Sequence, residues 1–136
     1  SIVDLVFRGE PPRVEGAVLQ WGAVELAGLH VDPMGVRCRA LVDCTGHDAE
    51  VLALAASRMP GLGLELKGHK SMWAPEAERL VVKHTGRVCP GLYVAGMAVA
   101  TLYGLPRMGP IFGGMLLSGK KVARAVIEDL IGLGGP

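Results

Sequence analysis

Aromatic side chains and clustered charges are scarce in this sequence. Phe, Trp and Tyr together make up 4% of the 136 residues, and the formal net charge at pH 7 is only +1. No basic run is present, and no ladder of aromatic residues accompanies the scattered Lys and Arg. Because nucleic-acid-binding surfaces depend on such features, we expect no nucleic-acid partner.

Long apolar runs are missing as well. No stretch reaches the roughly 18 apolar residues that a membrane-spanning helix needs, and no secretory leader is visible. The cysteines Cys38, Cys44 and Cys89 are odd in number and lack C-x-x-C spacing, which favours reduced thiols in buried or half-buried positions. These absences predict a cytoplasmic protein without a membrane partner.

Apolar residues and glycine, by contrast, are abundant. Half of the residues are hydrophobic, and the 20 glycines are about twice the usual share. A chain of this length buries roughly two thirds of its unfolded surface, which is enough for a real core. We therefore expect residues 1–136 to form a single α/β domain with sites lined by backbone.

We expect the rest of the fold to be arranged around segment 90–121. Residues 92–95 (LYVA) form an unbroken apolar run ending at Gly96, which is typical of a strand buried on both faces of a parallel sheet. Pro110 suits a first helical position, and apolar residues recur at roughly helical spacing over 112–130. The pattern predicts a strand, a Gly-rich loop and a long C-terminal helix.

Two interpretations of the glycines at this helix start remain open. Gly109, Gly113 and Gly114 carry no Cβ atom, so a phosphate-bearing ligand could approach the unpaired amides of the first helical turn. Glycine-rich turns also often serve geometry and tight packing only, and the pattern by itself favours this second interpretation.

Shorter elements are expected before this segment. They are a β-hairpin or meander over 14–21 and 23–29, a strand over 36–43, a helix over 49–58, a loop over 61–75 and a short strand over 78–82. Asp48 is the predicted N-cap of the helix, because Asp readily accepts hydrogen bonds from first-turn amides.

His30, Asp32 and His47 are the strongest candidates for metal binding or catalysis. Imidazole and carboxylate ligands together suit iron, zinc or manganese, and only two of the three need to be ligands. A site with few protein ligands keeps positions open for a substrate. The alternatives are a polar loop histidine, a turn-initiating aspartate and a hydrogen-bonded histidine at a helix start. His69 and His84 are expected to be solvated.

Arg107 precedes the predicted helix start. Its guanidinium could hold a carboxylate or phosphate through two parallel hydrogen bonds, and a surface ion pair is the alternative. Lys120 and Lys121 lie about three turns farther along the helix and are expected to be solvated.

Five longer motifs carry a resemblance to a known family. They are AGLHVDP (27–33), DCTGHDAEV (43–51), MWAPEAERLVV (72–82), PGLYVAGMAVATLYG (90–104) and PRMGPIFGGMLLSGKK (106–121). In these motifs and their order, the chain resembles the thiamine thiazole synthases, particularly the archaeal type.

The resemblance implies part of a Rossmann-like dinucleotide-binding fold, related to the flavoprotein oxidoreductases, and a homo-oligomer. Members of this family consume NAD, glycine and a sulfur source to build an adenylated thiazole carboxylate. Eukaryotic members carry a sulfur-donating cysteine at the position occupied here by His30. Because a histidine cannot donate sulfur, the resemblance implies the sulfide-dependent archaeal chemistry with bound Fe(II).

Site residues follow from the same resemblance. Asp32 and His47 fall on the iron ligands, and His30 is the expected catalytic residue. Arg107 is expected to meet the carboxylate derived from glycine. The set expected to bind the dinucleotide-derived ligand is Gly96, Met97, Arg107, Met108 and Gly109.

The N-terminal half of this family has no counterpart in these residues. A G-x-G-x-x-G turn and an acidic ribose partner are both missing. We therefore expect activity only when that half comes from the parent chain or another polypeptide. Two rival functions stay open: a ribose 1,5-bisphosphate isomerase, with phosphate held by Arg107 and the helix start, and a non-catalytic dinucleotide-binding remnant.

Overall fold

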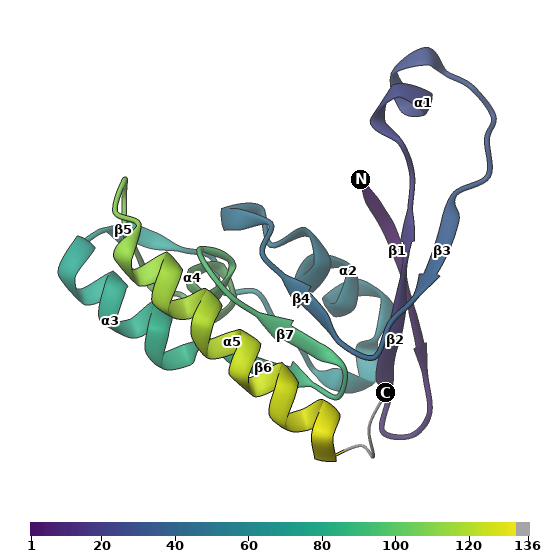
Figure 1. Cartoon of the computed structure of the whole chain (residues 1–136). Helices are drawn as coiled ribbons and strands as arrows, with labels where there is room; N and C mark the ends of the chain where they lie inside the picture. The colour runs from purple at the N-terminus through teal and green to yellow at the C-terminus, as the bar shows by residue number, and fades with distance from the viewer. Residues whose placement is uncertain (133–136) are drawn as a thin grey trace.

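The computed structural model describes residues 1–132, which form three small sheets and five α-helices (Figure 1). β1 (Ile2–Arg8), β2 (Arg13–Leu19) and β3 (Met34–Arg37) form an antiparallel sheet in that order. The predicted meander is therefore present, although its first strand lies before residue 14.

The chain between β2 and β3 projects from the rest of the molecule and carries α1 at its far end (Figure 1). We call residues 20–33 the arm. The strand predicted over 23–29 is wrong, because these residues contain α1 (Gly22–Ala27). The helix ends at Gly28, whose φ of 64° lets its amide bond back to the helix carbonyls, as in a common C-cap.

The second sheet holds β4 (Leu41–Asp43), β6 (Gly86–Cys89) and β7 (Leu92–Val94) in the order β4-β7-β6. β4 runs parallel to β7, and β6 runs antiparallel to it. The buried strand predicted after Pro90 is confirmed. The single strand predicted over 36–43 is instead divided between two sheets.

Helices cover both faces of this second sheet. Leu92 and Val94 of β7 pack into the main core, which also contains buried residues of α2 (Glu50–Arg58). Tyr93 alternates to the opposite face, where it packs beside α5 (Gly113–Gly132). The predicted helix over 49–58 and the long C-terminal helix are thus confirmed, although α5 begins at Gly113 and not at Pro110.

The glycines at the start of α5 permit close packing against α3 (Ala74–His84). A Cβ atom on Gly114 would lie 2.6 Å from Cγ of Glu78 and 2.7 Å from Sδ of Met108. A Cβ atom on Gly113 would lie 2.8 Å from Oε1 of Glu78. For these two glycines the packing interpretation is confirmed, and a protein carboxylate lies at the helix start.

The short strand predicted over 78–82 is wrong, because this stretch belongs to α3. Pro75 occupies the first turn, where a missing amide hydrogen costs nothing, and the buried residues Ala77 and Val81 recur at helical spacing. Lys121 of α5 donates hydrogen bonds to the last carbonyls of this helix, at 2.8 and 2.6 Å. Lys121 is therefore exposed but bound, contrary to the expectation of a solvated side chain.

The predicted loop over 61–75 contains a strand. β5 (Lys70–Met72) runs parallel to β8 (Pro106–Arg107), and together they form the third sheet. α4 (Ala98–Tyr103) connects the second sheet to β8.

Within residues 1–132, no helix is both long and apolar enough to cross a membrane.

All three cysteines are free thiols. Cys89 is buried and Cys38 is half-buried, as predicted, whereas Cys44 is exposed. Burial is the main cause that raises the pKa of each thiol above its usual value.

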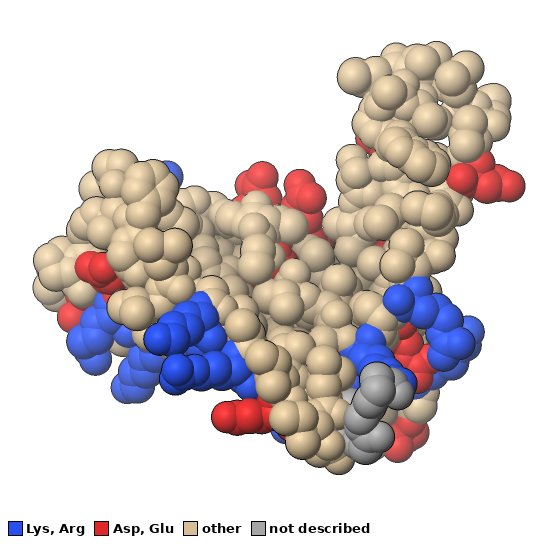
Figure 2. All heavy atoms as spheres, in the orientation of Figure 1, with Lys and Arg blue, Asp and Glu red and all other residues tan. Residues whose placement is uncertain are grey.

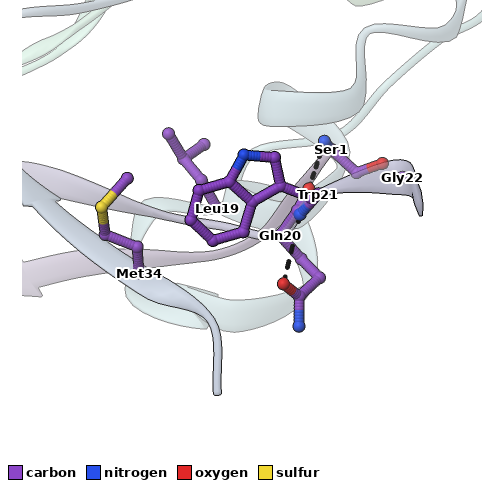
Figure 3. Close-up of a pocket in the computed structure, with 6 residues that line it drawn as sticks. All are labelled: Ser1, Leu19, Gln20, Trp21, Gly22 and Met34. Carbon is purple, nitrogen blue, oxygen red and sulfur yellow. Dashed lines mark hydrogen bonds between the residues drawn. The ribbon is translucent and has the colours of Figure 1, made fainter. Parts of the chain in front are cut away.

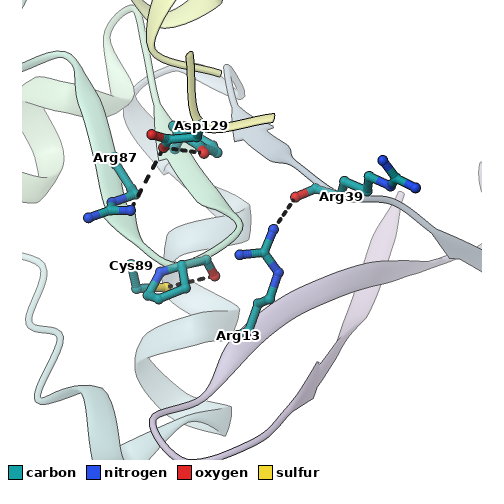
Figure 4. Close-up of polar contacts among 7 residues, drawn as sticks. Arg13, Arg39, Arg87, Cys89 and Asp129 are labelled. Carbon is teal, nitrogen blue, oxygen red and sulfur yellow. Dashed lines mark hydrogen bonds and ion pairs between the residues drawn. The ribbon is translucent and has the colours of Figure 1, made fainter. Parts of the chain in front are cut away.

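Polar contacts tie α5 to the second sheet near the end of the helix (Figure 4). The hydroxyl of Tyr93 donates to Oδ2 of Asp129 at 2.6 Å, and Arg87 forms an ion pair with the same carboxylate at 3.8 Å. Burial, followed by the hydrogen bond to Asp129, raises the pKa of Tyr93 to about 12. Arg13 donates to the backbone oxygen of Arg39 at 2.8 Å.

Asp43 ends β4 as a fully buried side chain and holds the turn that follows. Its Oδ1 accepts hydrogen bonds from the Thr45 amide (2.9 Å) and hydroxyl (2.7 Å), and its Oδ2 accepts one from the Leu52 amide (2.9 Å). The Thr45 hydroxyl oxygen accepts a further bond from the Glu50 amide at 2.8 Å. Side chains before the helix thus satisfy the free amides of its first turn.

The predicted N-cap, Asp48, lies one residue too early. The N-cap position of α2 belongs to Ala49, and no side-chain cap hydrogen bond is made there. Thr45 and Asp43, which come earlier in the chain, satisfy these amides because the 3₁₀-helix Gly46–Asp48 turns the chain back over them.

Replacing Asp43 should therefore destabilise the fold far more than replacing Asp48. Asp43→Ala leaves buried donors unsatisfied and should lower the free energy of unfolding by about 2–5 kcal/mol. Asp48→Ala should change it by less than about 0.5 kcal/mol, because that side chain is exposed. Denaturant unfolding followed by circular dichroism measures both, and equal effects would contradict the role given to Asp43.

Candidate functional site

His47 lies just beyond the carboxyl end of β4, in the 3₁₀-helix Gly46–Asp48. Its backbone oxygen accepts a hydrogen bond of 2.5 Å from Oγ1 of Thr101 in α4. Because ligands of open α/β sheets bind beyond the carboxyl ends of the strands, this position suits a site. Thr101 therefore fixes the segment that carries the imidazole.

His69 packs against His47, which the sequence did not predict. The ring centroids lie 4.6 Å apart, with the ring planes at 57°. The segment before β5 reaches this place because the Gly68 amide donates to the Thr101 backbone oxygen at 2.8 Å. The Lys70 amide also donates to the backbone oxygen of Leu105 at 2.8 Å. Sequence spacing carries no signal for this contact, since it depends on pairing with a distant part of the chain.

Arg107 ends β8 and reaches the same region as an exposed side chain. It pairs with Met72 of β5 in register, and its backbone oxygen accepts a hydrogen bond from the Trp73 amide at 3.1 Å. Its positive charge acts on His47, where it is one of the causes that lower the pKa. Arg107 and the two histidines thus gather at one place from three segments.

The surroundings of the His47 imidazole favour its neutral form. Burial is the largest cause that lowers its pKa from 6.5, followed by the charges of His69 and Arg107, whereas Asp48 opposes the shift. Its Nε2 atom is buried and lacks a hydrogen-bond partner among the described residues. An unpaired imidazole nitrogen in a neutral ring suits a metal ion or a ligand hydrogen bond.

Gly96 is engaged inside the protein. Its amide donates to Oγ of Ser118 at 2.9 Å, and Ser118 shares a hydrogen bond of 2.5 Å with the buried hydroxyl of Thr85. This network joins the end of β7 to α3 and α5. The Gly96 amide is therefore already satisfied, and ligand binding by this residue stays a prediction.

Met97, Met108 and Gly109 also make internal contacts. Met97 and Met108 are buried in the main core. Gly109 has a φ of 68°, and a Cβ atom there would lie 3.1 Å from Cε and Sδ of Met72. These contacts give the three residues structural roles, and their part in ligand binding remains a prediction.

His30 and Asp32 lie on the arm as exposed residues. In Figure 1 the loop between α1 and β3 stands apart from α4 and β5. Asp32, which lies in that loop, is not among the charged groups that shift the pKa of His47. The separation arises because β3 and β4 belong to different sheets. Within residues 1–132, no three His, Cys, Asp or Glu side chains form a group able to hold a metal ion.

A hollow of about 320 Å³ lies where the arm meets the first sheet (Figure 3). It is lined by Ser1, Leu19, Gln20, Trp21, Gly22 and Met34. Its side chains are mostly apolar, with the Gln20 amide and the Ser1 hydroxyl as the polar groups, and they include no carboxylate, imidazole or thiol.

Comparison with known proteins gives consistent matches. The model of the Thi4 family matches residues 1–112. A thiamine thiazole synthase of Pyrobaculum calidifontis is 59% identical over 127 residues, which are 93% of this chain and 49% of the relative. One from Archaeoglobus fulgidus is 57% identical over 130 residues, covering 96% of this chain and 50% of the relative.

A solved structure agrees with these matches. The crystal structure of Thermovibrio ammonificans THI4 is similar with a TM-score of 0.88 and 43% sequence identity, over 96% of this chain and 51% of that chain. The chain thus spans about half the length of the curated relatives it matches.

The environment of His47 predicts a specific pH dependence. Its folded pKa is depressed, so the stability that it contributes is present above pH 6.5 and is lost as the pH falls toward the folded value. Histidine NMR titration of the metal-free chain should give a midpoint below 6.5.

Arg107→Gln should raise that midpoint, because it removes a positive charge that acts on the ring. Arg87→Gln is the matched control, since Arg87 pairs instead with Asp129. An unshifted midpoint in Arg107→Gln would mean that the two side chains do not interact.

Proposed function

Because the chain belongs to the Thi4 family, we propose that it forms the C-terminal half of a sulfide-dependent thiamine thiazole synthase. The reaction builds an adenylated thiazole carboxylate from NAD, glycine and sulfide with Fe(II). The proposed fold is the matching portion of a Rossmann-like dinucleotide-binding domain. Relatives named thiamine thiazole synthase support this role in thiamine biosynthesis.

The observation that carries the proposal is the unpartnered, buried Nε2 of His47 close to the exposed Arg107. His47 offers a neutral nitrogen to the iron. Arg107 holds the carboxylate that glycine contributes, through two parallel hydrogen bonds of its planar guanidinium. The iron, when bound, supplies a Lewis-acid centre with open positions for substrate and sulfide.

Asp32 is the second proposed iron ligand, and it requires another copy of the chain. Asp32 lies between α1 and β3, on the arm that projects from the rest of the molecule (Figure 1). The arm also exposes apolar side chains, with Leu26 92% and Leu29 60% exposed, and most of its surface in Figure 2 is uncharged, with acidic groups at its sides. Because apolar surface of this kind marks contact sites, we propose a homo-oligomer in which the arm of one copy supplies Asp32 to another.

His30 is proposed as the residue that makes free sulfide necessary. It stands on the arm, two residues before Asp32, so it would reach the site together with that ligand. An imidazole can hold or deliver a proton near the incoming sulfide, but it has no sulfur to give.

The N-terminal half is proposed to bind the dinucleotide, since these residues lack the G-x-G-x-x-G turn. The parent chain or another polypeptide would supply it. The rival isomerase function needs phosphate at the start of α5, where the Glu78 carboxylate lies beside Gly113. Repulsion between like charges weighs against that function.

The whole proposal is tested by activity. The chain joined to the N-terminal half of the Pyrobaculum calidifontis relative should form the thiazole adenylate only with NAD, glycine, sulfide and Fe(II) all present. Its intact mass should be unchanged after turnover, because no residue donates sulfur. Activity without sulfide, together with a loss of mass at a cysteine, would contradict the sulfide-dependent mechanism.

The same assay can test whether Asp32 of one copy and His47 of another form the iron site. His47→Ala and Asp32→Ala should each be inactive alone, whereas the two variants mixed and reassembled should regain part of the activity. Recovery is expected because some mixed interfaces contain both intact ligands. No recovery would contradict the supply of Asp32 by a second copy.

Arg107→Lys should weaken binding of the carboxylated thiazole adenylate by about tenfold to a hundredfold. An ammonium keeps the charge but loses the paired hydrogen bonds, each worth roughly 1.5–3 kcal/mol to a charged partner. Binding of ADP-ribose, which has no such carboxylate, should be nearly unchanged in calorimetry on the same joined protein. Equal weakening of both ligands would assign Arg107 to the phosphates or to the fold.

A further inference from the structure

His69 has no part in the function proposed above, yet it is the nearest aromatic partner of His47. The two ring centroids are 4.6 Å apart, and the planes are tilted by 57°. His47 is half-buried and His69 is exposed, so the pair lies at the protein surface.

One residue positions both histidines. Oγ1 of Thr101 donates to the backbone oxygen of His47, and the backbone oxygen of Thr101 accepts the amide of Gly68, next to His69. Thr101 is itself buried in α4. The two backbone segments that carry the rings are therefore both held by contacts with Thr101.

The spacing fits shared metal ligation. Two imidazoles bound to one ion through metal–nitrogen bonds of about 2.1 Å have ring centres about 4.6 Å apart when the bonds meet at about 90° and about 5.3 Å apart at a tetrahedral angle. The buried Nε2 of His47 lacks a partner among the described residues, which is costly for a polar atom unless a ligand satisfies it. Imidazole pairs suit iron, zinc, cobalt and nickel.

Simple ring stacking is the competing explanation, and the chain contains an example of it. His84 lies beside Tyr103 with centroids 5.1 Å apart and planes at 34°. A tyrosine ring offers no imidazole nitrogen to a shared ion, whereas His69 does. The two contacts therefore differ in what they can bind.

We propose that His69 is a further metal ligand and forms, with His47, a two-imidazole site for a divalent transition metal. This inference deepens the proposed function, because it rests on His47 as an iron ligand. With two ligands from one copy and Asp32 from another, the ion would keep open positions for substrate.

The test is metal binding by the full chain, independent of turnover. Anaerobic Co²⁺ titration, followed by visible absorption and calorimetry, should show at least about tenfold weaker binding in His69→Ala and in His47→Ala. His84→Ala is the matched control and should bind like the unmodified chain. Circular dichroism establishes that each variant is folded, and His69→Gln repeats the test with a side chain closer in size.

Direct ligation has its own signature. On addition of Zn²⁺, histidine NMR should show ring-nitrogen shifts for both His47 and His69, with the ring nitrogens of His84 unchanged. A merely structural role of His69 would leave its ring nitrogens unshifted while the affinity fell, and that result would overturn the inference.

The outcomes separate this inference from the proposed function. Loss of affinity in His47→Ala but not in His69→Ala would overturn the role of His69 and leave the proposed iron ligand His47 intact. Unchanged affinity in both variants would overturn both. Equal weakening in His84→Ala would mean non-specific binding by surface histidines and would also overturn the two-imidazole site.

Discussion

The buried carboxylate of Asp43 is the constraint on which the candidate site depends. A carboxylate removed from water must be hydrogen-bonded, and this one accepts bonds from Thr45 and Leu52. Those bonds hold the end of β4, the following turn and the first turn of α2 in one arrangement. His47 lies inside that turn, so its position follows from satisfying a charge buried at the strand end.

At the start of α5, glycines that would also suit ligand binding serve helix packing. Gly113 and Gly114 allow α3 to approach closely, and the Glu78 carboxylate lies at the helix start. An anionic ligand would meet this negative charge there. Recognition of a carboxylate is therefore better served by Arg107, which is exposed beside His47 at the end of β8.

The candidate groups are divided between two parts of the molecule. His47, His69 and Arg107 gather on the body, whereas His30 and Asp32 lie on the arm. The chain also spans about half the length of the curated relatives it matches. Both facts agree with the proposal of a site completed by other copies and by an N-terminal half, since no three metal-ligating side chains form a group within residues 1–132.

The sequence by itself determined the family, the buried strand β7, the helix α2 and the long helix α5, because uninterrupted motifs and local periodicity carry that information. It also singled out His47 and Arg107. Tertiary structure alone decided that Asp43 and Thr45, and not Asp48, cap α2, and that residues 78–82 are helical. It likewise decided that His69 lies against His47 while Asp32 does not, because these relations depend on the parallel pairing of β5 with β8 and on the separation of β3 from β4. Such long-range pairings cannot be predicted from residue spacing.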